Sequence, residues 1–423
     1  EAISGVPASQ IETLASMIGS TPKTFFRLGY GFTRQRNGAA SMHAALSISA
    51  VAGSWRHEGG GAFHTNGGIY HWDKTLIEGL DCLDPKVRVL DQSRIGPILT
   101  GDRQDLGDGP PVTALLIQNT NPMSVAPDLN RVHDGFARED LFVCVHEQFV
   151  PETAHVADII LPATMFLEHD DLYQAGGHQH ITLGPRIVNP PEGCRSNHEV
   201  ICALARRLGV DHAGFDMTSR EIIDRTLQDS GWGNLENLEQ KHWIDCQPEF
   251  RDSHYLDGFA HADGRFHFSP DWNALLPHGF GPADTVMPSL PDHWDVIEEA
   301  NSEMPYRLVT APARHYLNST FTETPTSSRR QKRPSAMLHP DDARNLKVGD
   351  GDTIRLGNLR GEIPIAAEVV ETAQRGVVIV ESIWPNRAFV GGKGINVLTG
   401  ADPVAPVGGA AFHDTRIWIR PEL

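Results

Sequence analysis

Cysteines are few in this chain, and no two of them lie close together. The five are Cys82, Cys144, Cys194, Cys202 and Cys246, so the 423 residues contain no C-x-x-C pair. This spacing excludes a recognisable zinc ribbon and a complete iron–sulfur motif within the chain. An odd and sparse set of cysteines also fits a reducing compartment, and we therefore expect a cytoplasmic protein.

Long apolar runs and an excess of positive charge are also missing. No apolar stretch reaches the ~20 residues that a membrane-spanning helix needs. The chain has 36 Lys and Arg against 54 Asp and Glu, which gives a net charge of −18. This sign disfavours nonspecific binding to nucleic acid or to an anionic membrane, and we expect neither as a partner. The exception is the basic run SSRRQKRP at 327–334, which either is a solvated loop or holds an anion.

The N-terminal segment has the pattern of the interior of a longer chain. It lacks an initiator methionine and a signal-peptide pattern, so we expect the natural polypeptide to start upstream of residue 1. The stretch GVPASQIETLASMIG predicts an amphipathic helix with Ser9 as its N-cap. Residues 23–53 then predict a strand, a tight turn at Gly29 and Gly31, and a helix from about Gly38. This is half of a dinucleotide fingerprint, because Arg34 stands where the third glycine would be.

The middle of the chain predicts a parallel α/β sheet. VTALLIQNTNP (112–122) and LFVCVHEQF (141–149) are apolar runs typical of strands, and ETAHVADIILPAT (152–164) supplies a helical turn and a third strand. LNRVHDGFARED (129–140) is a plausible helix between them. Unbroken apolar strands alternating with short helices indicate a parallel sheet that is buried on both faces. SNHEVICALARRLG (196–209) predicts a helix capped by Ser196 and Glu199 and ended by Gly209, and 210–300 has weaker periodicity.

From Tyr306 onwards the pattern changes to short strands separated by Gly, Asp and Pro turns. These are YRLVTAP, DTIRLGN, GEIPIAAEVV, GVVIVESIW and DTRIWIRP, with one helix predicted within LHPDDARNLKVGDGD (338–352). Several strands at this spacing, without matching helices, favour a small closed barrel.

The stretch DIILPATMFLEHDDLYQAGGHQHITLGP (158–185) concentrates potential metal ligands. His169 neighbours two aspartates in a predicted loop, and His178 and His180 share a strand face. No third partner stands at ligand spacing, which disfavours a zinc or iron site there.

Several segments, in this order, carry a family resemblance. The most specific are NTNPMSVAPDLNRV, REDLFVCVHEQFVPETAHVADIILPATMFLEHDD, GPRIVNPPEGCRSNHEVICALARRLG, APARHYLNSTF, LHPDDARNLKVGDGDTIRLGNLRGEI and NVLTGADPVAPVGGAAFHDTRIWI. Together they resemble the C-terminal part of the molybdopterin-dependent oxidoreductases of the dimethyl-sulfoxide-reductase family. That family includes formate dehydrogenases, nitrate reductases and related anaerobic dehydrogenases.

The resemblance implies an α/β fold of parallel-sheet dinucleotide-binding domains followed by a six-stranded β-barrel of the double-psi type. It places the remainder of a truncated pterin-dinucleotide domain at 1–65 and a second α/β dinucleotide-binding domain at 66–215. A connecting segment follows at 216–300, and the molybdopterin-dinucleotide-binding barrel occupies 301–423.

The implied cofactor is molybdenum or tungsten held by two pyranopterin guanine dinucleotides, in an enzyme that transfers two electrons or an oxygen atom. An electron-transfer subunit is a further implied partner. The metal's protein ligand and the cysteines of a [4Fe–4S] cluster would lie upstream of residue 1. We therefore assign no metal ligand within the chain and expect the chain by itself to be inactive.

Matching segment to segment implies a set of cofactor contacts. Glu147 stands where the family usually has Asp to bind ribose hydroxyls, and Asp158 and Thr164 are candidates for guanine or ribose contacts or for structural roles. The other implied cofactor contacts are Gly29, Tyr30, Gly31, Asn119, Thr120, Asn121, Gln148, Arg314, His315, Asn318, Ser319, Asn396 and Phe412, with His413 and Arg416 nearby.

Alternatives remain open for several of these residues. The barrel residues could equally be ordinary turns. The glycine-rich stretch 55–68 either borders the active-site cavity, with His64 and Asn66 facing substrate, or is a flexible turn.

Two other functions compete with the redox enzyme. One is a non-catalytic structural subunit of a redox complex that kept the fold without the pterins, although LNSTF and NVLTG weigh against it. The other is a metallohydrolase that uses the His-rich segment.

Overall fold

The computed structural model describes residues 1–282, 284–295, 298–381 and 383–422. Position 382, within the predicted strand segment GVVIVESIW, lies outside the described residues, as does position 423 at the end of the predicted barrel domain. Positions 283, 296 and 297 of the predicted connecting segment also lie outside them. Within the described ranges, no helix is both long enough and apolar enough to cross a membrane.

The chain divides into two compact units that each combine distant segments. The first unit comprises Glu1–Gly29, Met42–Arg88 and Pro162–Pro270. The second comprises Tyr30–Ser41, Val89–Leu161 and Asp271–Leu423. Segments that the sequence analysis assigned to different domains therefore contribute to the same unit, and the domain boundaries stay a prediction.

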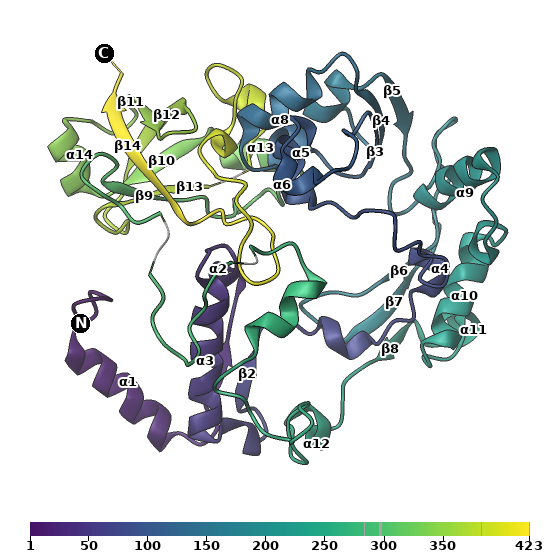
Figure 1. Cartoon of the computed structure of the whole chain (residues 1–423), viewed down its shortest axis with the longest axis horizontal. Coiled ribbons are helices and arrows are strands. Elements are labelled where there is room, and N and C mark those ends of the chain that lie inside the picture. Colours follow the sequence, from purple (N-terminus) through teal and green to yellow (C-terminus); the bar gives the residue numbers. More distant parts are fainter. Residues whose placement is uncertain (283, 296–297, 382, 423) are drawn as a thin grey trace. The chain divides into compact units, whose positions relative to one another are not determined.

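The second unit contains a closed six-stranded barrel, labelled β9–β14 in Figure 1. Around the barrel the strand order is β10-β12-β11-β14-β9-β13, with parallel and antiparallel neighbours. Alternate strand residues such as Leu308, Ile354, Leu356 and Val378 are fully buried, because successive side chains of a strand point to opposite faces. The strands are Tyr306–Val309 (β9), Ser335–Leu338 (β10), Thr353–Gly357 (β11), Glu362–Val369 (β12), Val377–Val380 (β13) and Thr415–Pro421 (β14).

The barrel prediction is confirmed, with one strand missed. The sequence predicts five strands, and β10 is the sixth. Its sequence, SAML, lacks β-branched and aromatic residues, and its last residue, Leu338, falls within the segment 338–352 that predicts the helix α14 (Pro340–Leu346). The basic run before it is partly helical, in α13 (Pro325–Gln331), rather than a plain loop.

The second unit also holds the predicted parallel sheet, in the order β3-β4-β5. Helices α5 (Ile95–Leu99) and α8 (Leu129–Phe136) pack against each other beside it. A Cβ at Gly135 would lie 2.5 Å from Leu99 Cβ, so this close helix crossing requires glycine. The remaining elements here are Ala114–Gln118 (β3), Phe142–Glu147 (β4), Ile159–Pro162 (β5), Tyr30–Thr33 (α2), Arg103–Leu106 (α6), Pro122–Val125 (α7), Gln92–Arg94 (η3), Glu152–Val156 (η4), Trp272–His278 (η6), Asn386–Ala388 (η7) and Ile395–Val397 (η8).

The expectation that this sheet is buried on both faces is wrong. Leu116 in β3, Phe142 in β4 and Ile159 in β5 are each more than 40% exposed. On the other face of β4, Val143 and Val145 are buried in a core shared with the barrel. An apolar run in the sequence therefore predicts that a segment is a strand, but it does not predict that both faces of the sheet are buried.

The first unit is built around an antiparallel sheet, β6-β7-β8, with its own core. Ile181 of β7 packs in that core with Leu227 of α10 and Leu238 of α11, and all three are fully buried. A separate parallel pair joins β1 (Phe25–Arg27) to β2 (Gly61–Phe63). The other elements are Asp171–Tyr173 (β6), His180–Gly184 (β7), Trp243–Asp245 (β8), Ala8–Ser20 (α1), Thr75–Glu78 (α4), Asn197–Leu208 (α9), Ser219–Asp229 (α10), Leu235–Lys241 (α11), Phe250–Ser253 (α12), Ser54–Arg56 (η1), Gly67–Tyr70 (η2) and Ala213–Phe215 (η5); α3 (Gly38–Ala52) spans both units.

The capping residues predicted from the sequence are correct for α9 and wrong for α1. Helix α9 has the expected capping box between Ser196 and Glu199 and ends at Gly209 in the left-handed region. The same motif at Thr218 and Glu221 opens α10, which the sequence analysis missed in its weakly periodic segment. Ser9 is not an N-cap: α1 begins at Ala8 after Pro7, and the Glu1 carboxylate accepts the Ala8 N–H at 3.2 Å.

Candidate functional site

Two predicted cofactor contacts meet at the carboxyl ends of β3 and β4. Glu147 is the last residue of β4, and Asn119 follows β3, where its N–H donates to the His146 carbonyl at 3.1 Å. Asn119 adopts a positive φ of 51°, which turns the chain sharply at the strand end. Because β3 and β4 are parallel, their carboxyl ends share one edge, as dinucleotide-binding sheets require.

Glu147 is a partly buried carboxylate whose charge is only partly compensated. Burial raises its pKa above the usual value, and hydrogen bonds from the Gln148 N–H and the Asn119 side chain oppose that rise. The Gln148 N–H donates to Glu147 Oε1 at 2.7 Å. A carboxylate has about four acceptor positions, so these contacts leave room for further donors.

Asn121 serves a different purpose from Asn119 and Thr120, which are exposed. It is 4% exposed, and its amide donates to Glu152 Oε2 at 2.8 Å. Its carbonyl oxygen accepts from the Thr153 N–H and hydroxyl at 3.1 and 2.8 Å. Glu152 also accepts the Asn386 N–H at 2.9 Å. The side chain of Asn121 therefore holds the loop after β3 against η4, and Glu152 connects that region to the barrel segment at Asn386.

Asn396 makes a second connection of this kind. It is 2% exposed, and its amide donates to the carbonyls of Ser124 and Val125 at 3.0 and 3.1 Å. Its carbonyl oxygen accepts the Thr399 hydroxyl at 3.1 Å. An amide used in this way positions the loop and has little capacity left for a ligand.

Asp158 lies away from the edge that carries Glu147. Its N–H donates to the Val143 carbonyl at 2.9 Å, and its carboxylate accepts the Val143 N–H at 2.7 Å. Val143 is the second residue of β4 and Glu147 is the last. The structure therefore does not bring these two carboxylates together.

Arg314 and His315 line a cavity of about 450 Å³ at the barrel. Three residues of the basic run, Arg330, Lys332 and Arg333, line it too. Within the described part of the chain, the three arginines and the lysine of this cavity form no salt bridge. Three carboxylates also line the cavity, and each accepts from a neutral donor: Glu368 from Ser335, Glu381 from Gln331 and Asp350 from the Val369 N–H.

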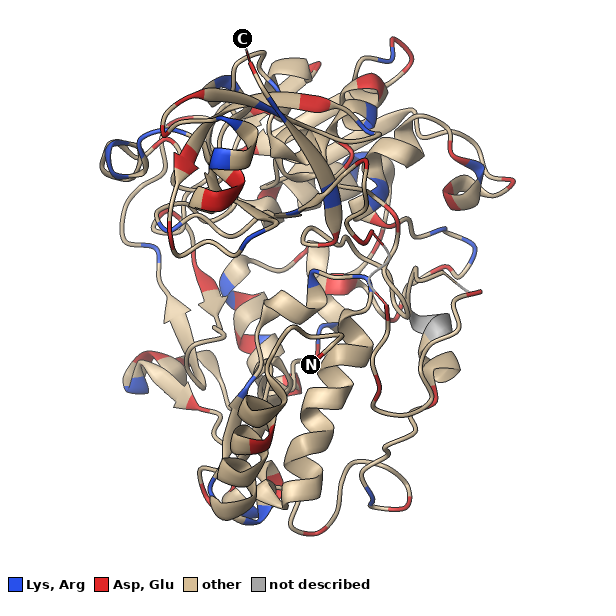
Figure 2. Cartoon of the chain, turned by 90° about the vertical axis from the view of Figure 1, so that its left-hand side faces the viewer, with Lys and Arg blue, Asp and Glu red and all other residues tan. Residues whose placement is uncertain are grey.

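The cavity thus brings four Lys and Arg side chains together with three carboxylates, so it carries a small excess of positive charge whose cations are not engaged in ion pairs. Elsewhere near the C-terminus, Lys and Arg are interspersed with Asp and Glu, as Figure 2 shows. Asn318 and Ser319 follow in the same loop, with Asn318 exposed and at a φ of 51°.

The end of the barrel near Phe412 is tied to the segment that carries Tyr30 and Gly31. The Phe412 carbonyl accepts the Thr310 hydroxyl at 3.1 Å, and the His413 N–H donates to the Arg34 carbonyl at 2.9 Å. Burial lowers the pKa of His413, and the charge of Arg34 lowers it further. Arg416 donates to the Glu299 carbonyl at 3.3 Å.

The same segment is anchored by a buried ionic network that the sequence analysis missed. Arg36 is 4% exposed, and its guanidinium lies 3.3 Å from Glu298 and 3.1 Å from Asp402. Arg360 also pairs with Glu298. Burial alone would raise the pKa of Glu298, but the hydrogen bond from Arg360 and the charges of Arg360 and Arg36 outweigh it and hold this pKa below its usual value.

The glycines of the turn leave space beside the backbone. A Cβ at Gly29 or at Gly31 would meet no other described atom within 4 Å. At Gly38 it would lie 1.7 Å from the Phe32 carbonyl oxygen, so the start of α3 requires glycine.

The predicted residues of the first unit have local partners. Asn66 donates to the His178 carbonyl at 2.5 Å, and the His64 carbonyl accepts from Arg27 at 2.7 Å. The strand β2 occupies only 61–63 of this stretch, and His64 and Asn66 lie in the irregular segment between β2 and η2, so both alternatives for them stay predictions. Thr164 pairs with His169 Nδ1 at 2.7 Å.

The His-rich stretch does not gather metal ligands in the described residues. His178 and His180 lie 5.7 Å apart between ring centroids, and the one group of potential ligands found in those ranges is Asp81, Cys82 and His212. A larger cavity of about 670 Å³, lined by residues between Gly231 and Asp245, contains no predicted site residue.

The chain matches known proteins over nearly its whole length. Residues 12–207 match the family described as "Molybdopterin oxidoreductase", and residues 306–416 match the "Molydopterin dinucleotide binding domain". It is 30% identical to "Probable oxidoreductase YoaE" of Bacillus subtilis over 99% of this chain and 59% of that protein. It is 24% identical to "Trimethylamine-N-oxide reductase" of Haemophilus influenzae, over 92% of this chain and 52% of that protein.

The fold has a known counterpart as well. The structure of "Acetylene Hydratase from Pelobacter acetylenicus" superposes with a TM-score of 0.61 at 16% identity, covering 78% of this chain and 46% of that one. This likeness concerns the fold alone. The chain spans between half and three-fifths of the length of the first two curated relatives. From the two matched domains and the relatives, the chain belongs to the molybdopterin oxidoreductases of the dimethyl-sulfoxide-reductase family.

Proposed function

We propose that this chain forms part of an oxidoreductase that binds molybdenum or tungsten through two pyranopterin guanine dinucleotides. The observation that carries the proposal is the pairing of Asn119 and Glu147 at one edge of the β3–β4 sheet. A carboxylate at the end of a parallel strand is the group that dinucleotide-binding folds use to bind ribose hydroxyls.

The residues present fit a nucleotide. Burial raises the pKa of Glu147, so its carboxylate gains from additional hydrogen-bond donors. A ribose diol offers two such donors. Glutamate is one methylene longer than the aspartate usual in the family, and the Asn119 contact holds its carboxylate near the strand end.

The cavity at the barrel fits an anionic group of the same class of ligand. Arg314, Arg330, Lys332 and Arg333 supply positive charge there, and phosphate oxygens are among the acceptors that arginine binds strongly. This supports the anion-holding interpretation of the basic run. Gly29 and Gly31 leave space for close approach of a ring or phosphate to the backbone.

When bound, the metal centre supplies the two-electron chemistry, and this chain's residues bind and orient the cofactor. In this proposal Glu147 accepts from ribose, the basic cavity neutralises phosphate, and Asn121 and Asn396 hold the loop after β3 in register with the barrel. None of these residues needs to touch the substrate.

Oxygen-atom transfer is the reaction class that we favour. "Biotin sulfoxide reductase" of Cereibacter sphaeroides aligns with 97% of this chain and trimethylamine-N-oxide reductase with 92%. The relatives named formate dehydrogenase and nitrate reductase align with 64% and 65% of it. The wider coverage supports an S-oxide or N-oxide substrate over formate.

The test uses the complete natural polypeptide, purified without oxygen. Elemental analysis should find molybdenum or tungsten, and acid treatment should release two guanine nucleotides per metal. Reduction of S-oxides and N-oxides should then exceed formate oxidation and nitrate reduction. A protein without metal and nucleotide would instead support the non-catalytic structural subunit, and preferred formate oxidation would reject only the substrate class.

A further inference from the structure

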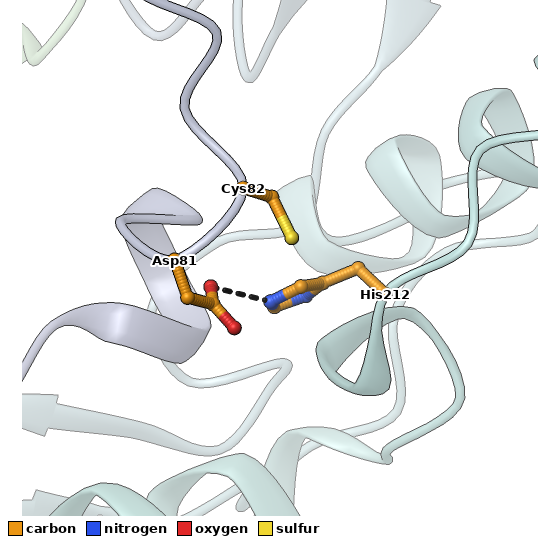
Figure 3. A group of neighbouring side chains, drawn as sticks. All are labelled: Asp81, Cys82 and His212. Atoms are coloured by element: carbon orange, nitrogen blue, oxygen red, sulfur yellow. Dashed lines mark hydrogen bonds and ion pairs between the residues drawn. The ribbon is translucent and has the colours of Figure 1, made fainter.

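A Cys–His–Asp group lies in the first unit, outside every residue that the proposed function uses. Asp81 and Cys82 lie in the exposed segment after α4, and His212 lies in the turn between α9 and η5. One ligand atom from each lies within 4.8 Å of the others, and no second such group occurs in the described ranges. Figure 3 shows the Cys82 sulfur and the Asp81 carboxylate pointing toward the His212 ring.

His212 is held in place before any ligand arrives. Its side chain is only 9% exposed, and its ring packs edge-on against Phe215 with 5.6 Å between centroids. Its Nδ1 accepts the Gly214 N–H at 3.2 Å, which places the ring proton on Nε2. Nε2 then donates to Asp81 Oδ1 at 3.1 Å. The ring is therefore held with Nε2 directed toward Asp81 and Cys82.

The donor set selects among metal ions. A thiolate sulfur, an imidazole nitrogen and a carboxylate oxygen are the three ligand types of protein zinc sites, whereas Ca²⁺ and Mg²⁺ prefer oxygen alone. Tetrahedral Zn²⁺ holds neighbouring ligand atoms about 3.3–3.8 Å apart, given bonds of roughly 2.0–2.3 Å. The observed separations, from 3.1 Å to at most 4.8 Å, bracket this range. Both Asp81 and Cys82 are exposed, so their side chains can close the remaining gap.

We propose that Asp81, Cys82 and His212 bind Zn²⁺, with water completing the tetrahedron. The site is new relative to the sequence analysis, which assigned no metal ligand in the chain. It is independent of the pterin cofactor and stands or falls separately from the proposed function.

Binding exchanges protons in a defined way. Zn²⁺ takes the Nε2 lone pair, so the ring proton moves to Nδ1 and the Gly214 N–H loses its acceptor. That hydrogen bond lies at the long end of the normal range, and the Nδ1–H and the Gly214 N–H must move apart when zinc binds, which is a cost of binding. Cys82 must also lose its proton. Zinc affinity should therefore fall as the pH is lowered.

The site would fasten a segment that otherwise has few buried contacts. Leu83 and Val87 are 66% and 68% exposed. The close approach of the Leu76 carbonyl to Gly214 is one contact that already joins this segment to η5. A metal bridge between Cys82 and His212 would add a cross-link between two stretches that are far apart in the sequence.

The first experiment titrates the metal-free 423-residue chain with Co²⁺ and then displaces it with Zn²⁺. A cobalt–thiolate charge-transfer band should appear in the near ultraviolet and saturate at one equivalent. Cys82→Ser should abolish the band. His212→Gln should weaken zinc binding by at least the roughly 10- to 100-fold that even an outer-shell change causes.

The matched control is His267→Gln. His267 Nε2 lies 3.1 Å from Asp263 Oδ1, the same geometry as His212 with Asp81, but without a cysteine in a ligand group. This variant should keep the band and the affinity. A band that persists in Cys82→Ser, that never forms in the parent chain, or that is lost equally in the control would overturn the proposal. Thermal unfolding of each metal-free variant checks that the substitution leaves the fold intact.

Discussion

The barrel and the β1–β2 pair are both strand structures, but they differ in how completely their edges are used. Each barrel strand has a neighbour on both sides, and residues such as Ile354 and Leu356 are fully buried. β1 and β2 pair only with each other in the described structure, and no residue of the preceding helix α1 is buried. Leu14, Met17 and Phe25 are each about half exposed or more. Closure thus leaves the barrel without a free strand edge, whereas the β1–β2 region presents apolar surface and open strand edges.

Hydrogen exchange should show the largest contrast. Amides of β11 and β12 should exchange at least roughly a thousandfold more slowly than those of β1 and β2, a difference of about 4 kcal/mol in opening free energy. The physical reason is that opening one barrel strand breaks two ladders and exposes core, while β1 has one partner. Mass spectrometry of the 423-residue chain measures both. Equal protection would mean that edge closure does not control stability here.

Core truncation sharpens the same comparison. Leu356→Ala should lower the free energy of unfolding of the barrel by about 2–5 kcal/mol, because it leaves a cavity at a fully buried site. Leu14→Ala in α1, which removes the same atoms from a side chain that is 57% exposed, should change it by less than about 0.5 kcal/mol. Chemical unfolding of both variants is the measurement. Similar losses would contradict the assignment of the core.

The correct predictions from the sequence rest on interactions between residues that are close together in the chain. The capping box of α9 joins Ser196 to Glu199, three residues apart, and was predicted correctly. Apolar runs identified β3 and β4, and turns identified five barrel strands. The strand β10 was missed because its sequence, SAML, contains no β-branched or aromatic residue. Ser9 was a wrong cap because Pro7 and Glu1 set the helix start instead.

The site was predictable only in part. The β3 and β4 strand ends, with Asn119 and Glu147, follow from parallel pairing, since the carboxyl ends of such strands share an edge. The structural use of Asn121 depends on Glu152, Thr153 and Asn386, and no local pattern links these positions. The contacts of Arg36 with Glu298 and of Asp81 with His212 are equally long-range, which is why neither was found.

The ion pairs of Glu298 should make a pH-dependent contribution to the free energy of unfolding of the second unit. The pKa of Glu298 is lowered in the folded state. Its stabilising effect is therefore present at pH values above the unfolded-state pKa of about 4.3, and it is lost as the pH falls through the lower folded-state pKa. Glu298→Gln should cost roughly 1.5–3 kcal/mol at pH 7 and flatten this acid dependence. Unfolding free energies measured from pH 7 down to acid conditions provide the comparison.

Glu299→Gln is the matched control for that experiment, because Glu299 is the exposed neighbour. It should leave both the stability at neutral pH and its acid dependence nearly unchanged. If the two variants behaved alike, the ion pairs of Glu298 with Arg36 and Arg360 would be without energetic consequence.

The most direct test of the central claim is cofactor retention in the complete natural polypeptide carrying Glu147→Ala. Removing a charged acceptor of ribose hydroxyls should lower dinucleotide affinity by about 1–3 kcal/mol, the range for losing a hydrogen bond to a charged group. Guanine nucleotide and metal per polypeptide, measured after dilution and gel filtration, should fall relative to the parent and to Glu139→Ala, an exposed glutamate just before β4. Unchanged retention in Glu147→Ala would contradict the assignment of the β3–β4 edge as a dinucleotide site.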